Sequence, residues 1–129
     1  MINYDQSYSV SIILPILNEI NSLKKTIKIL NKINVQKEYL IIYSERLTNN
    51  NVKKEIINLK KRNKNISYKS QLRPFVGGAI DLGIKLAKKN YIVIMASDLE
   101  TNPNELKNMI KVSKKNPKCI ISADRWISQ

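Results

Sequence analysis

Short apolar runs alternate with amphipathic helical patterns along the chain. The apolar runs are rich in β-branched and aromatic residues and are bounded by polar residues, which is typical of buried strands. The predicted strands are Tyr8 to Leu14, Tyr39 to Tyr43, the edge strand Asn65 to Ser70, Tyr91 to Met95, and Cys119 to Ala123.

Helical periodicity fills the segments between these runs. We expect helices over residues 21–33, 50–63 and 103–115, and a further helix that starts within residues 77–89. Asn21 or Ser22 is the expected N-cap of the first helix. The residues expected on the packing faces are Leu23, Ile27 and Leu30; Val52, Ile56 and Leu59; Ala79, Gly83, Leu86 and Ala87; and Leu106, Met109 and Ile110.

The order of these elements is a repeated strand–helix unit. Such a repeat predicts an α/β fold with a largely parallel sheet and helices on both faces, because parallel neighbours need crossover connections. With 129 residues and 43% hydrophobic content, the chain is expected to form a single domain over residues 1–129.

Composition excludes several kinds of chemistry. The sequence has no histidine, which excludes Ser-His-Asp and Cys-His catalysis and imidazole zinc sites. Its single cysteine, Cys119, cannot form an intrachain disulfide and is predicted to be a small core residue. Carboxylates, lysines, hydroxyls or a bound ion must carry any reaction.

The formal net charge of +13 suggests an anionic partner, such as a nucleotide, a nucleic acid or an acidic membrane surface. Most of the lysines, however, recur at helical spacing on predicted outer faces, a pattern that is also typical of an ordinary solvated surface. Specific nucleic-acid binding is the least favoured of these, because no aromatic-interleaved basic strand or zinc module accompanies the charge. The start of the chain has no signal-peptide pattern and no apolar run is long enough to span a bilayer. We therefore expect a cytoplasmic protein, and a peripheral contact with a membrane is compatible with its charge.

Acidic residues gather where the predicted strands end. Ligands of parallel α/β sheets bind beyond the carboxyl ends of the strands. Five of the ten acidic residues fall at those ends, although each is also compatible with an ordinary loop or capping role. They are Glu19 (after Asn18), Glu45, Asp98, Glu100 and Asp124 (before Arg125).

Asp98 and Glu100 stand one residue apart after the strand that starts at Tyr91. They could serve the start of the next helix. However, Asn102 as N-cap, Pro103 at the first helical position and Glu105 at the third already form a capping-box-like start. The two carboxylates are then available to hold a hard divalent ion through oxygen ligands.

Three segments in this order resemble the family-2 glycosyltransferases, and most closely their dolichol-phosphate mannosyltransferase-like branch. The segments are VSIILPILNEINSLKKTI, RPFVGGAIDLGIKLAKKNYIVIMASDLETNPNELKNMI and IISADRW. The resemblance implies a GT-A fold, of which this chain is the Rossmann-like, nucleotide-binding N-terminal half. It also implies sugar transfer from a nucleotide-diphosphate donor to a lipid-linked or polysaccharide acceptor.

In that family a D-x-D motif follows the fourth strand and carries Mg²⁺ or Mn²⁺ against the donor diphosphate. On this resemblance Asp98 is the principal metal ligand and Glu100 adds a second oxygen. Such an ion would stabilise the charge that develops on the departing phosphate oxygens. Ala96 stands in the place of the first aspartate of the motif.

The resemblance also assigns the nucleotide pocket. Pro15, Asn18 and Glu19 match the first-strand motif that borders it. Gly77 and Gly78 match a small-residue turn before the third helix, where backbone approaches the donor. A tight turn with close helix packing explains the two glycines equally well.

The sequence departs from the family at several of these positions. Paired aspartates after the second strand, which contact the nucleotide base in the family, are replaced by Ser44 and Glu45. The glycine and serine that follow them are replaced by Arg46 and Leu47, and the usual arginine of the third helix by Asp81. Glu45 is still predicted to be one of the residues that bind the nucleotide sugar.

Arg125 matches an arginine of the family's G-S-R segment, and it either faces the phosphates or pairs with an acid. The chain stops four residues after it. In the family the acceptor-side strands and the catalytic base come later, so we expect a domain truncated on the acceptor side and assign no catalytic residue. The sequence is either a fragment or a naturally short relative that is degenerate or is completed by a partner subunit or a second copy. Three hypotheses remain: a glycosyltransferase-type domain that transfers, or once transferred, sugar from a nucleotide donor, a non-catalytic binding or scaffold protein on the same fold, and a basic nucleic-acid-binding domain.

Overall fold

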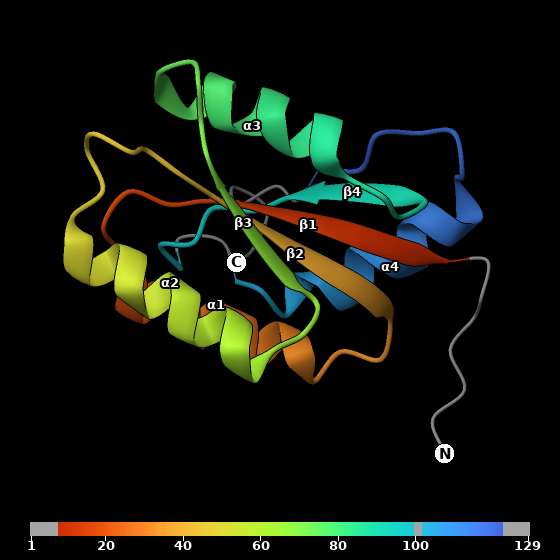
Figure 1. Ribbon diagram of the computed structural model, residues 1–129. Coiled ribbons are helices and arrows are strands. Elements are labelled where there is room, and N and C mark those ends of the chain that lie inside the picture. The colour runs from red at the N-terminus through yellow and green to blue at the C-terminus, as the bar shows by residue number, and fades with distance from the viewer. Residues whose placement is uncertain (1–7, 100–101, 123–129) are drawn as a thin grey trace.

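The computed structural model describes residues 8–99 and 102–122, in which strands and helices alternate (Figure 1). The strands are β1 (Ser9–Pro15), β2 (Gln36–Tyr43), β3 (Ile66–Ser70) and β4 (Tyr91–Ile94). The helices are α1 (Ile20–Asn31), α2 (Asn50–Arg62), α3 (Phe75–Leu86) and α4 (Glu105–Lys115).

The four strands form one parallel sheet in the order β3-β2-β1-β4. In the register Pro15 pairs with Ile42, and Ile13 pairs with Ile94. The interiors of the two central strands, β1 and β2, are mostly apolar and β-branched, because these strands are covered on both faces, whereas the outer strands β3 and β4 alternate between covered and exposed residues. Since all strands run the same way, their carboxyl ends share one edge of the sheet.

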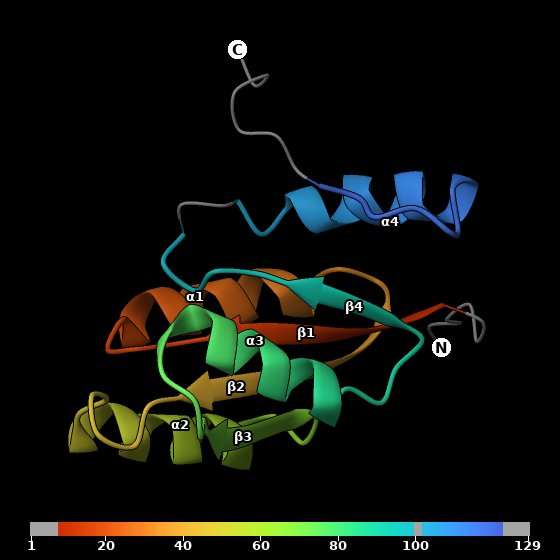
Figure 2. The same cartoon turned by 90° about the horizontal axis from the view of Figure 1, so that it is seen from above.

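Helices cover both faces of this sheet, as Figures 1 and 2 show. Helices α1, α2 and α4 lie on one face, where Leu23, Ile56 and Leu106 join the larger core cluster with Ile12 and Tyr39. Helix α3 lies on the other face. The structure therefore confirms the predicted α/β fold class, and the arrangement is Rossmann-like.

The face with α3 has a smaller core. Ala79 and Gly83 are buried against Ile13, and a methyl group added at Gly83 would lie 2.5 Å from Ile13 Cγ2. Ile92 and Ile94 of β4 are 44% and 51% exposed, and Ile94 pairs with Ile13 in the sheet. The narrow packing face predicted for the third helix is thus correct, but α3 leaves β4 partly uncovered.

Two helix ends differ from the prediction. Helix α1 has Glu19 at its N-cap position, two residues before Asn21 and three before Ser22. Helix α4 starts at Glu105 after a turn in which the Glu105 N–H bonds to the Asn102 carbonyl, so Asn102 and Pro103 precede the helix. The Asn102 side chain nevertheless accepts the Asn104 N–H at 3.0 Å, the bond that an N-cap residue makes to the second residue after it, so the predicted capping interaction is present one turn before the assigned start of α4.

The predicted last strand is also wrong over its described residues. Residues 119–122 are not in a strand, Ile120 is 99% exposed and Cys119 is exposed, so Cys119 is not a core residue. The segment has strand propensity, but such propensity needs a neighbouring strand, and none lies beside it among the described residues. None of the described helices is long and apolar enough to span a membrane.

Candidate functional site

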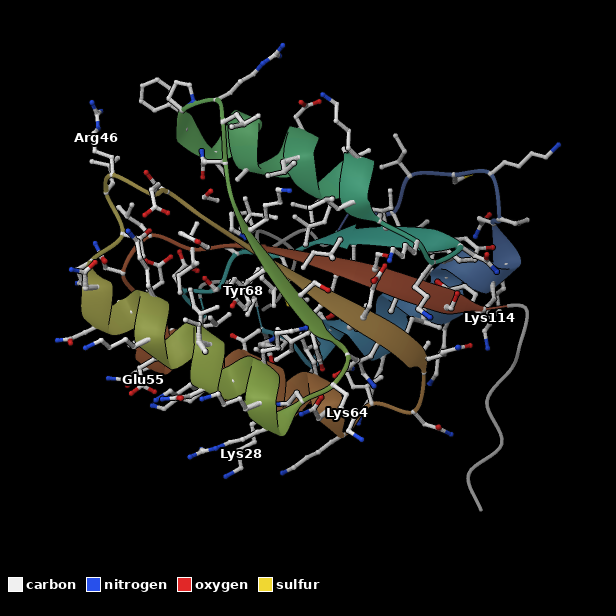
Figure 3. The ribbon with its side chains drawn as sticks, in the orientation of Figure 1. Lys28, Arg46, Glu55, Lys64, Tyr68 and Lys114 are labelled. Carbon is white, nitrogen blue, oxygen red and sulfur yellow. The ribbon has the colours of Figure 1, made fainter. Side chains whose placement is uncertain are left out.

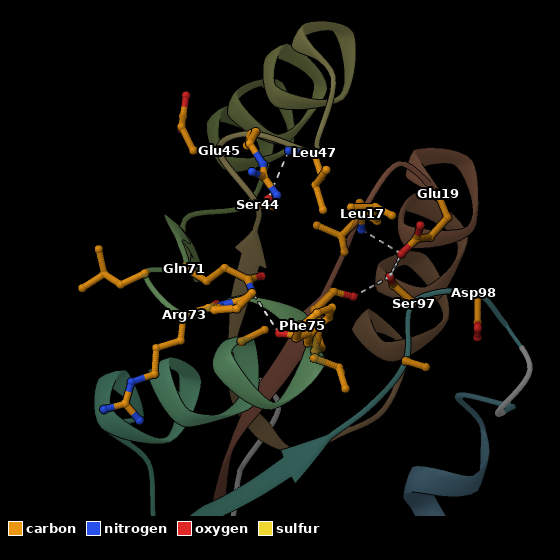
Figure 4. Close-up of a pocket in the computed structure, with 18 of the residues that line it drawn as sticks. Leu17, Glu19, Ser44, Glu45, Leu47, Gln71, Arg73, Phe75, Ser97 and Asp98 are labelled. Atoms are coloured by element: carbon orange, nitrogen blue, oxygen red, sulfur yellow. Dashed lines mark hydrogen bonds between the residues drawn. The ribbon is translucent and has the colours of Figure 1, made fainter.

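A cavity of about 830 Å³ lies at the carboxyl edge of the sheet (Figure 4). It is built by the ends of all four strands and by the segments that follow them. The lining residues are Pro15, Ile16, Leu17 and Glu19; Ser44, Glu45, Arg46 and Leu47; Gln71, Leu72, Arg73, Pro74, Phe75, Val76 and Ala79; and Ile94, Ala96, Ser97 and Asp98.

Glu19 orders the loop between β1 and α1. One carboxylate oxygen accepts the Leu17 N–H and the other accepts the Asn18 N–H, both at 3.0 Å. The buried Ser97 hydroxyl lies 3.4 Å from the first of these oxygens and 3.0 Å from the Pro15 carbonyl, to which it donates. The carboxylate of Glu19 therefore fixes one wall of the cavity by binding the protein's own donors (Figure 4).

Asn18 joins this wall to the next one. Its side-chain amide donates to the Leu47 carbonyl at 3.2 Å, and its side-chain carbonyl accepts the Asn49 N–H at 2.8 Å. Asn18 does not line the cavity. It acts on the cavity by tying the loop after β1 to the loop after β2.

Two hydroxyl groups of the loop after β2 stabilise that loop by accepting hydrogen bonds from its backbone. Ser44 Oγ accepts the Leu47 N–H at 3.1 Å, and Thr48 Oγ1 accepts the Ser44 N–H at 3.2 Å. Glu45 points outward, where its carboxylate pairs with Lys53 Nζ at 3.0 Å. This pairing turns the carboxylate of Glu45 away from the cavity, and Ser44, Arg46 and Leu47 line the cavity beside it.

The segment between β3 and α3 forms the third wall. Gln71 Nε2 donates to the carbonyls of Arg73 and Phe75, each at 2.8 Å. Phe75 has a φ of 67°, a left-handed conformation that costs a bulky residue about 1–2 kcal/mol, and the two bonds from Gln71 help to hold it. The phenyl ring is 85% exposed at the cavity rim.

Gly77 and Gly78 lie inside the first turn of α3, so the predicted turn before the helix is wrong. A Cβ at Gly78 would lie 2.3 Å from the Arg73 carbonyl oxygen, whereas a Cβ at Gly77 would meet nothing within 4 Å. Neither glycine lines the cavity. Because Gly78 has no side chain, the Arg73 carbonyl can occupy this space. The segment between β3 and α3 can therefore pack closely against the start of α3.

Of the remaining predicted site residues, Pro15, Glu19, Glu45 and Asp98 line the cavity. Glu100, Asp124 and Arg125 lie outside the described residues. The lining residues that the sequence pattern did not single out are mostly apolar and exposed: Leu17, Leu47, Leu72, Phe75 and Val76. The sequence does carry a signal for them, namely apolar residues within otherwise polar loops. Exposed leucine and phenylalanine side chains in adjacent loops can form a binding surface.

Asp98 is exposed at the end of β4 and is a cavity-lining carboxylate (Figure 4). The described residues include no group of three or more acidic or cysteine side chains that could hold a metal ion. Ala96, at the position of the other expected ligand, offers no side-chain oxygen, and both oxygens of Glu19 accept protein donors. The described residues alone therefore do not form a divalent-ion centre.

Comparison with protein families gives one finding that bears on this edge of the sheet. The sequence matches the family described as glycosyl transferase family 2 over residues 11–129, which includes β1 from Ser11 onward, the other three strands and the residues that line the cavity. A comparison with curated proteins gives no significant match.

Proposed function

Because the chain belongs to glycosyl transferase family 2, we propose that the cavity binds a nucleotide-diphosphate sugar as the donor for glycosyl transfer to an acceptor. The single observation that carries the proposal is the position of the cavity. It lies at the carboxyl edge of a parallel, Rossmann-like sheet, where ligands of this fold class bind.

The walls of the cavity suit the parts of such a donor. Leu47, Leu72 and Phe75 give an apolar surface for the flat face of a nucleobase. Arg46 and Arg73 are exposed at the rim and supply positive charge for phosphate oxygens. The guanidinium of Arg73 points away from the cavity in Figure 4, so its contact with a phosphate requires a change of rotamer.

The role of a metal ion is a separate part of the proposal. Mg²⁺ or Mn²⁺, with Asp98 and Glu100 as the proposed ligands, would neutralise charge on the leaving diphosphate. Asp98 is the described member of this pair. The other proposed ligand, Glu100, lies outside the described residues.

A second candidate function is binding without catalysis. Ala96 in place of a carboxylate favours it, as does the absence of a three-ligand group among the described residues. On this alternative the cavity holds a nucleotide and the protein acts as a binding or scaffold subunit. Metal-independent nucleotide binding without sugar transfer would support this alternative.

Calorimetric titration with UDP and with GDP, each with and without Mn²⁺, tests the proposal. We expect one nucleotide to bind, and Ala96→Phe to abolish binding because its ring would enter the cavity. Val112→Phe is a matched control, since Val112 is 44% exposed on α4 and does not line the cavity.

Metal dependence is read from the same titrations. If Asp98 is a metal ligand, Asp98→Ala removes the gain in affinity that Mn²⁺ gives and leaves metal-free binding unchanged. Absence of binding by the folded wild-type protein under all four conditions would overturn the proposed function.

A further inference from the structure

Helices α1 and α2 lie side by side on one face of the sheet, with their outer surfaces turned to solvent (Figure 1). Lys24 Nζ of α1 pairs with Glu55 Oε2 of α2 at 2.7 Å, and Asn31 Nδ2 donates to Asn63 Oδ1 at 3.2 Å. The two helices therefore form one continuous surface, which we name the α1–α2 face.

Lysines occupy the outer ridge of each helix. In α1 the buried residues Leu23, Ile27 and Leu30 define the inner side, and the opposite side carries the exposed Lys25 and Lys28. Lys32, one turn further along the same ridge, is also exposed. The ridge is therefore basic from Lys25 to Lys32.

Helix α2 repeats this arrangement. Val52, Ile56 and Leu59 are buried, and the opposite side carries Lys54 and Lys61, both exposed. Figure 3 shows Lys28 pointing away from the sheet on this side of the molecule, with Lys64 beyond the end of α2. The acid within α1 and α2 is Glu55, and its charge is matched by Lys24.

An apolar side chain stands within the basic ridge of α2. Ile57 is 40% exposed between Lys54 and Lys61, on the side opposite the core. A flat basic helical surface with an exposed apolar residue suits a lipid surface, where lysines meet anionic headgroups and the apolar group enters the interface.

We infer that the α1–α2 face docks on an anionic lipid bilayer through Lys25, Lys28, Lys54 and Lys61, with Ile57 entering the interface. A nucleic acid fits this face less well. Helices α1 and α2 contain no aromatic residue on which a base could stack.

Docking on this face would leave the cavity accessible. The cavity is lined by the loops that precede α1 and α2, so it opens at the end of the helices and not on their outer side. The bound bilayer would lie beside the mouth of the cavity.

Co-sedimentation with vesicles of phosphatidylcholine containing 30% phosphatidylserine tests the inference. The test variant carries Lys28→Gln, Lys54→Gln and Lys61→Gln. The matched control carries Lys69→Gln, Lys85→Gln and Lys88→Gln, which remove three exposed lysines from β3, α3 and the loop after α3. Both variants lose the same charge, and circular dichroism checks that both are folded.

Each lysine near an anionic surface contributes about a fivefold change in partitioning. We therefore expect the test variant to bind roughly 100-fold more weakly and the control to bind within a factor of about five of wild type. Ile57→Gln is expected to weaken vesicle binding without changing binding to a single-stranded DNA probe at low salt.

Two results would overturn the inference. One is equal loss of vesicle binding in both triple variants, which would show a response to net charge and not to this face. The other is tighter binding to the DNA probe than to the vesicles, with the loss again confined to the α1–α2 face, which would assign the face to nucleic acid.

Discussion

The side-chain carbonyl of Asn18 accepts the backbone N–H of Asn49 at 2.8 Å, although the two residues follow different strands. This bond and the bond from Asn18 Nδ2 to the Leu47 carbonyl fix the position of two walls of the cavity relative to each other. The proposed site is therefore ordered by polar groups behind the walls as well as by the residues that face the ligand.

Asn18→Ala is expected to loosen the loop over residues 44–49. Two hydrogen bonds are lost at an exposed position, so we expect a fall of about 1–2 kcal/mol in the free energy of unfolding. Hydrogen exchange at the Asn49 amide should become faster. Asn58→Ala, an exposed asparagine of α2, is the matched control, and equal exchange rates at Asn49 in both variants would contradict the role given to Asn18.

Gly83 and Gly77 lie in the same helix but in different surroundings. Gly83→Ala is expected to destabilise the protein by about 1–3 kcal/mol, because its methyl group would overlap Ile13. Gly77→Ala is expected to stabilise it by about 0.5–1 kcal/mol, since alanine is the better helix former and the space is open. Chemical denaturation measures both changes, and the same sign for the two variants would refute the packing of α3.

Tyr39 gives the protein a predicted sensitivity to alkaline pH. Burial raises the pKa of the Tyr39 phenol well above its ordinary value, and its hydroxyl donates to Asn31 Oδ1 at 2.7 Å. In the unfolded chain the phenol ionises near pH ~10, whereas in the folded chain it stays neutral. The unfolded state therefore loses the proton first, and the stability due to Tyr39 is present below that pH and is lost as the pH rises above it.

The measurement is the free energy of unfolding between pH 8 and pH 11.5. Tyr39→Phe should be less stable than wild type at pH 8 by about 1 kcal/mol, because the hydrogen bond is lost, and it should show a shallower decline above pH ~10. Asn31→Ala removes the hydrogen-bond acceptor but keeps the phenol. The free energy of unfolding of this variant should therefore decline above pH ~10 as steeply as that of wild type. Parallel curves for Tyr39→Phe and wild type would contradict the assignment.

Ala96→Asp places a second carboxylate beside Asp98 at the end of β4. If the loss of this ligand limits metal binding, the variant should gain affinity for Mn²⁺ together with a nucleoside diphosphate, by about tenfold or more. Ala96→Asn, which has the same shape without the charge, is the control. No gain in Ala96→Asp would favour the alternative in which the protein binds without catalysis.

Much of the fold could be predicted from the sequence. Strands such as β1 and β2 are runs of β-branched residues with both faces buried, and α1 and α2 have clear inward stripes, so local pattern and tertiary packing agree. The order of strands and helices also predicts which edge of the sheet ligands would use, and the cavity lies at that edge. These features depend on periodicity, which the sequence carries directly.

The features that the sequence does not predict depend on individual contacts that helix and strand periodicity does not encode. Position 78 requires glycine because of the Arg73 carbonyl, and Glu19 stands at the N-cap position of α1 while its carboxylate binds N–H groups of the loop before it. The outward turn of the Glu45 carboxylate depends on Lys53, one turn into α2. The prediction that Cys119 is a core residue follows the usual burial of free cysteine, and it is wrong because Cys119 is exposed.

The most direct test of the central claim is a map of backbone amide chemical shifts during titration with UDP and with GDP. If the cavity is the nucleotide site, the perturbed amides should be those of Leu17, Ser44 to Leu47, Gln71 to Val76, and Ala96 to Asp98, and Ala96→Phe should remove the changes. Perturbations confined to the α1–α2 face, or an unchanged spectrum at millimolar nucleotide, would contradict the account.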